Sequence, residues 1–115
     1  MSIRFKDDRI SGEWANCHPP LRAQILELAQ YAEELGVKSL VITCLWRSAE
    51  ENADLPNSNP KSLHMTLPIR AADIRTRNLT TDVVNQLDQH WHQHRPDDSY
   101  GLLVEANHIH VQQRG

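Results

Sequence analysis

Apolar residues at three- and four-residue spacing predict two amphipathic helices. The first opens at Pro19-Pro20 and ends before Gly36, a residue that suits a C-terminal cap. Its buried face is predicted to consist of Leu21, Ile25, Leu28, Ala32 and Leu35. The second helix is capped by Thr80 or Thr81 and ends at Pro96. Its buried face is predicted to consist of Val83, Val84, Leu87 and Trp91.

Short apolar segments predict strands between and after these helices. Residues 40–45 are apolar and rich in β-branched side chains, and residues 71–74 form a second, shorter segment. Residues 100–104 and 108–112 are predicted to pair as antiparallel strands joined at 105–107. The turn-forming Pro, Asn and Ser residues from Pro56 to Pro60 indicate a long surface loop. The pattern predicts an α+β fold in which helices pack on a small, mainly antiparallel sheet.

Length and composition are those of one globular unit. At 115 residues the chain is expected to form a single domain, 1–115, with a core of its own. The net charge of −3 does not favour a nucleic-acid partner. Two cysteines, Cys17 and Cys44, are too few for a disulfide framework, so reduced thiols are expected.

The first residues hold no apolar run. Met1 to Asp8 therefore predict neither a signal peptide nor a transmembrane segment. We expect cytoplasmic synthesis and no membrane partner.

Residue types that bind zinc lie in two clusters. One holds His64 and Asp73, and the other holds Glu105, His108 and His110. Alternate residues of a strand share one face, so His108 and His110 point the same way, with Glu105 at the adjoining turn. Two imidazoles and a carboxylate suit a zinc ion that keeps one open position, as hydrolases use. The alternative is that both histidines are solvent-facing positions on a half-exposed strand.

Two further patterns of histidines allow other interpretations. The run from His90 to His94 lacks the glutamate of an HExxH motif, which favours a solvated helix end with Trp91 in the core. The string His108-Ile109-His110 also fits a nuclease in which such a pair binds a metal and a tyrosine attacks DNA. That class needs a tyrosine on a later helix, and residues 111–115 include no tyrosine. The acidic net charge also opposes a DNA partner.

A third motif joins the two clusters. Residues 42–52 suggest a strand that ends in an aromatic-Arg-Ser turn, followed by an acidic residue and Asn. With Ser62-x-His64, Ala72-Asp73 and the His-Ile-His string, in this order, the chain resembles the zinc peptidases of the D-alanyl-D-alanine carboxypeptidase group. That group includes murein endopeptidases, phage peptidoglycan peptidases and the hedgehog signalling domain. The resemblance implies the hedgehog/DD-peptidase variety of α+β fold.

The resemblance also implies a metal site and a general base. It makes His64, Asp73 and His110 the ligands of one zinc ion per chain. It makes His108 a second imidazole beside the metal and Glu105 the base that activates the metal's water. The implied reaction is hydrolysis of a peptide bond by a metal-activated water.

Substrate contacts follow from the same resemblance. Arg47 matches an arginine that steadies the scissile carbonyl or a substrate carboxylate, and Ser62 matches a serine beside the first ligand. Trp46 either lines the cleft or packs in the core. The implied substrates are peptidoglycan stem peptides, cut by a D-Ala-D-Ala carboxypeptidase or by an L-Ala-D-Glu or crosslink endopeptidase.

The resemblance leaves a second functional class open. A non-catalytic zinc-binding module of the same fold, with a binding or virion structural role, would keep the same ligands. We expect a monomer in either case. Release by phage lysis, or a place in a virion, would bring a chain without a signal peptide to the cell wall.

Two departures from the family pattern bear on the ligands. Eight residues separate His64 from Asp73 where the family usually has six, so a bulge or a wider turn must absorb two residues. A Glu three residues before the ligand would select His108, whereas the second His of the pair would select His110. The string His-Ile-His-Val favours His110.

Overall fold

The computed structural model describes residues 3–48, 51, 53, 63–94 and 100–113. Its strands are β1 (Ile3–Phe5), β2 (Leu40–Cys44), β3 (Ala71–Arg75), β4 (Tyr100–Val104) and β5 (His108–Gln113). Its helices are α1 (Asp8–Glu13), α2 (Pro19–Glu34) and α4 (Thr81–His94), with short 3-10 turns η1 (Trp14–Asn16) and η2 (Leu63–Met65). The predicted loop from Pro56 to Pro60 lies outside the described residues.

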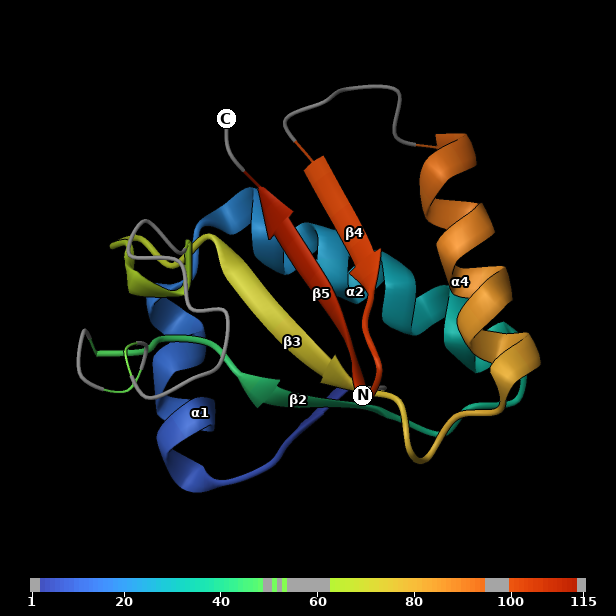
Figure 1. Ribbon diagram of the computed structural model, residues 1–115, viewed down its shortest axis with the longest axis horizontal. Helices are drawn as coiled ribbons and strands as arrows, with labels where there is room; N and C mark the ends of the chain where they lie inside the picture. Colours follow the sequence, from blue (N-terminus) through green and yellow to red (C-terminus); the bar gives the residue numbers. More distant parts are fainter. Residues whose placement is uncertain (1–2, 49–50, 52, 54–62, 95–99, 114–115) are drawn as a thin grey trace.

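The described strands form one five-stranded sheet in the order β1-β2-β3-β5-β4 (Figure 1). Strand β1 runs parallel to β2, whereas the pairs β2–β3, β3–β5 and β4–β5 are antiparallel. The α+β prediction is therefore confirmed, and the sheet is mixed. The apolar pattern predicts neither β1 nor α1.

The sheet buries one face and leaves the other polar. Along β5, Ile109 and Val111 are buried while His108 and His110 are partly exposed. Helix α2 crosses behind the sheet, and α4 lies beside β4 (Figure 1). This alternation places the histidine pair on the face that the two helices do not cover.

Both predicted helices form, and most of the residues predicted on their inner faces are buried. Leu35, the C-cap of α2, and Val83, in the first turn of α4, are only half-buried because each lies at a helix end. In α2 the buried residues are Leu21, Gln24, Ile25, Leu28, Ala29 and Ala32. Gly36 follows this helix with a φ of 90°, a conformation that favours glycine. Thr80, rather than Thr81, caps α4, because its hydroxyl accepts a hydrogen bond from the Val83 N–H at 3.2 Å.

Helix α1 forms hydrogen bonds with the segment that follows β2. The Asp7 side chain caps α1 by accepting from the Ile10 N–H, and Ile10 is buried. Glu13 accepts from the Trp46 N–H, and Arg9 donates to the Trp46 carbonyl.

Within the described residues, no helix is long and apolar enough to cross a membrane.

Candidate metal centre

Three imidazoles surround one carboxylate oxygen, Oδ1 of Asp73. His110 Nδ1 lies 3.1 Å from it, His64 Nε2 lies 3.3 Å and His108 Nε2 lies 3.7 Å. Asp73 and His110 are direct partners in the β3–β5 ladder, so the strand register itself brings them together. The structure thus assembles the predicted histidines and aspartate on one face of the sheet.

Main-chain atoms of the segment after β2 form hydrogen bonds with His64. Its side chain is buried, and its Nδ1 lies 2.7 Å from the Leu45 carbonyl oxygen, which can only accept. Nδ1 therefore donates a proton to this oxygen, and Nε2 faces Asp73. The Arg47 N–H donates to the His64 carbonyl at 2.9 Å. Asp73 reaches His64 although eight residues lie between them in the sequence.

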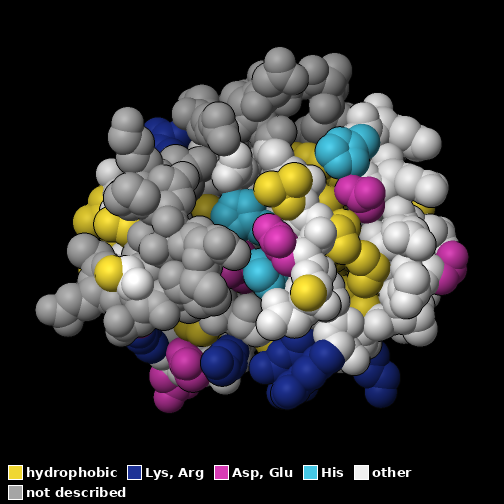
Figure 2. Space-filling view, in the orientation of Figure 1, with side chains coloured by type: hydrophobic (Ala, Val, Ile, Leu, Met, Phe, Trp, Pro, Cys, Tyr) yellow, Lys and Arg dark blue, Asp and Glu magenta, His cyan; other side chains and the backbone are white. Residues whose placement is uncertain are grey.

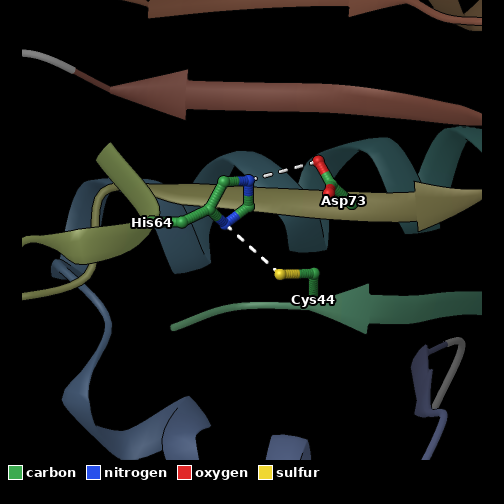
Figure 3. A group of neighbouring side chains, drawn as sticks. All are labelled: Cys44, His64 and Asp73. Carbon is green, nitrogen blue, oxygen red and sulfur yellow. Dashed lines mark hydrogen bonds and ion pairs between the residues drawn. The ribbon is translucent and has the colours of Figure 1, made fainter. Parts of the chain in front are cut away.

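Sequence reasoning missed one member of the site, Cys44. It is the cross-strand partner of Asp73, beyond a register shift between Ile42 and Cys44. Donor atoms of Cys44, His64 and Asp73 lie within 4.8 Å of one another, so this cluster could hold a metal ion (Figure 3). No motif signals this cysteine, because only the pairing register brings it to Asp73.

Among the described residues, the donors that lie close enough for one ion are those of Cys44, His64 and Asp73, and the predicted set with His110 shares two of these residues. The first set includes Cys44 from β2, and the predicted set includes His110 from β5, whose ring centroid lies 5.2 Å from that of His64. Both cysteines of the chain are free thiols, as expected.

The charges of the site follow from burial and from these contacts. Burial raises the pKa of Asp73, but hydrogen bonds with His110 and His64 outweigh it and hold that pKa well below its usual range. Burial lowers the pKa of His110, but hydrogen bonds with Asp73 and Gln112 raise it overall. Burial, then the charge of Asp73, raises the pKa of the Cys44 thiol to about 12.

An open cavity of about 910 Å³ lies over these residues. Its lining consists of Lys6, Thr43, Arg47, His64, Asp73, Arg75, Arg77, Glu105, Asn107, His108 and His110. Figure 2 shows His and acidic side chains gathered on this face, with Lys and Arg side chains along its lower edge. The predicted ligands, the predicted base and Arg47 thus meet at one cavity.

One predicted substrate residue lies away from the cavity. Trp46 is not among the residues that line the cavity and packs against the core instead. Ser62 lies outside the described residues.

Among the described residues, no acidic side chain forms an ion pair with Lys6, Arg75 or Arg77 of the cavity wall.

No protein-family model, curated protein or solved structure matches the chain. The resemblance to zinc peptidases therefore stays a prediction.

Proposed function

We propose that the protein is a zinc-dependent peptidase that hydrolyses peptide bonds of peptidoglycan stem peptides. One observation carries the proposal: His64 Nε2 and His110 Nδ1 converge on Asp73 Oδ1 in a cavity that Glu105 and Arg47 also line. Two imidazoles and a carboxylate leave one position of a tetrahedral ion for water.

The distances of His64 and His110 from Asp73 Oδ1 are those of neighbouring ligands on zinc. With bonds of 2.0–2.1 Å, two ligands of a tetrahedral zinc stand about 3.3 Å apart. The observed separations from Asp73 Oδ1 are 3.3 Å for His64 and 3.1 Å for His110, against 3.7 Å for His108. This supports His110 as the third ligand. Magnesium and calcium prefer shells of oxygen, which this site does not offer.

Each residue has a separate task in the proposed reaction. A zinc ion held here would polarise the carbonyl and lower the pKa of a water to about 7. Glu105 would take the proton of the attacking water and pass it to the leaving amine. Arg47 would donate to the carbonyl oxygen as negative charge develops on it, with His108 as a second donor.

The cavity wall supports an anionic substrate. Lys6, Arg75 and Arg77 have no acidic partner among the described residues and face the same cavity as the ligands. Stem peptides carry free carboxylates that such cations bind. If Arg47 holds the terminal carboxylate the enzyme is a carboxypeptidase, and if it does not, an endopeptidase.

One observation favours the second class, a non-catalytic zinc module. The donor atoms of Cys44, His64 and Asp73 lie within 4.8 Å of one another, and cysteine is the commonest ligand of structural zinc sites. Glu105 and the open cavity favour the peptidase.

Incubation with defined muropeptides tests the proposal. Zinc-loaded protein should release products identifiable by mass, and untreated protein should hold about one zinc per chain. Zinc without any product would indicate the non-catalytic module. A protein that holds no zinc, and whose melting temperature zinc leaves unchanged, contradicts both functions.

A further inference from the structure

Cys44 approaches the candidate centre from the sheet. It ends β2, directly across from Asp73, and its Sγ lies 3.7 Å from His64 Nδ1. That nitrogen already donates to the Leu45 carbonyl at the shorter distance of 2.7 Å. The Leu45 carbonyl, and not the Cys44 sulfur, is therefore the principal acceptor of this nitrogen.

The distances allow one ion to contact all three residues. Donors of a tetrahedral zinc with bonds of 2.0–2.3 Å stand about 3.3–3.8 Å apart. The donor atoms of Cys44, His64 and Asp73 lie within 4.8 Å of one another, so side-chain rotations that draw them together would let one ion contact all three. Cys44 does not line the cavity, so it would leave the cavity side of the ion accessible.

We propose that Cys44 is a further protein ligand of this metal, binding it as a thiolate from the sheet side. The S–H bond breaks, its proton passes to solvent, and the sulfur lone pair forms the bond to the metal without any redox change. With His110 also bound, water or the substrate carbonyl would enter as a fifth ligand, which catalytic zinc accepts. A thiolate selects zinc, cobalt or cadmium over manganese and magnesium. The inference rests on the proposed function only for the position of the metal.

Cobalt substitution of the full chain tests the ligand without reference to activity. The cobalt-loaded protein should show a thiolate-to-cobalt charge-transfer band in the near ultraviolet. Cys44→Ser and Cys44→Ala should lose the band and bind zinc about tenfold more weakly or worse. Cys17→Ala is the matched control, since Cys17 lies outside the cluster, and it should keep the band.

The outcomes separate this inference from the proposed function. Bound cobalt without the band, or a band that survives in both Cys44 variants, overturns the inference. Muropeptide cleavage by that same protein would leave the peptidase standing. A chain that binds neither cobalt nor zinc overturns both. Circular dichroism shows whether each variant is folded, and the two Cys44 variants check one another.

Discussion

Two histidine-rich segments of this chain differ in what their side chains contact. The segment from His90 to His94 holds three histidines in five residues, yet the first two contact different partners. His90 stacks on Tyr31 with ring centroids 4.0 Å apart, and His92 contacts Asp88 on the surface. Trp91 between them is buried, as predicted. The histidine pair of β5 instead meets His64 and Asp73.

The difference lies in geometry rather than in composition. Successive side chains of a helix turn by about 100°, so residues two apart, such as His90 and His92, lie on nearly opposite sides, whereas alternate residues of a strand share a face. The β5 pair also gains partners from β3 and η2, far away in the sequence. The density of histidines along a chain is thus a poor guide to a metal site.

The largest expected effect is on zinc affinity, which should fall when the candidate centre is changed and stay the same when a histidine of α4 is changed. His64→Ala or Asp73→Asn should weaken zinc binding by more than about 100-fold, because each removes a ligand or its charge. His92→Ala should leave it unchanged. Calorimetric titration with zinc measures both. Equal zinc affinity in the His64 and His92 variants would contradict the assignment.

Glu105→Gln should keep zinc but lower the turnover of a cleaved muropeptide by about 100-fold, because a general base is lost. Glu33→Gln, an exposed change on α2, is the control. Both rates are read from the products by mass. Full turnover in the Glu105 variant would remove this residue from the mechanism.

Within β5, the two histidines should differ by roughly tenfold or more in zinc affinity. His110→Ala should bind zinc more weakly than His108→Ala, since His110 lies closer to Asp73. The same calorimetric titration measures the difference. The reverse order would make His108 the ligand.

The cationic residues that line the cavity, Arg75 and Arg77 among them, should affect substrate binding more than metal binding. The double change Arg75→Gln and Arg77→Gln should lower kcat/KM for a carboxylate-bearing peptide by about tenfold, at up to about 1 kcal/mol per exposed charge pair. Arg4→Gln, outside this cavity, is the control. An unchanged kcat/KM would exclude these arginines from substrate recognition.

The smallest effect concerns α4. His90→Ala should lower the free energy of unfolding by about 0.5–1 kcal/mol through its stacking on Tyr31, and His92→Ala by a few tenths. Urea unfolding measures both. A loss of zinc in either variant would mean that α4 contributes to the metal site after all.

Strong apolar periods made α2, α4 and the strands β2 to β5 predictable from the sequence. Strand β1 was not predictable because it is three residues long, and α1 was not because only Ile10 in it is buried. The proximity of His110 and His64 to Asp73 was expected from the sequence because their residue types and order matched a pattern. Cys44 was not, because its role depends on a register shift in β2 that no residue type signals.

The bonds that orient His64 use main-chain atoms of residues 45 and 47. Exchanging either side chain leaves both hydrogen-bonding groups in place. Adding or deleting one residue there would displace the carbonyl by about 3.3 Å and turn the imidazole away from Asp73. The length of this short segment, more than its composition, is therefore what any metal-binding variant of the chain must preserve.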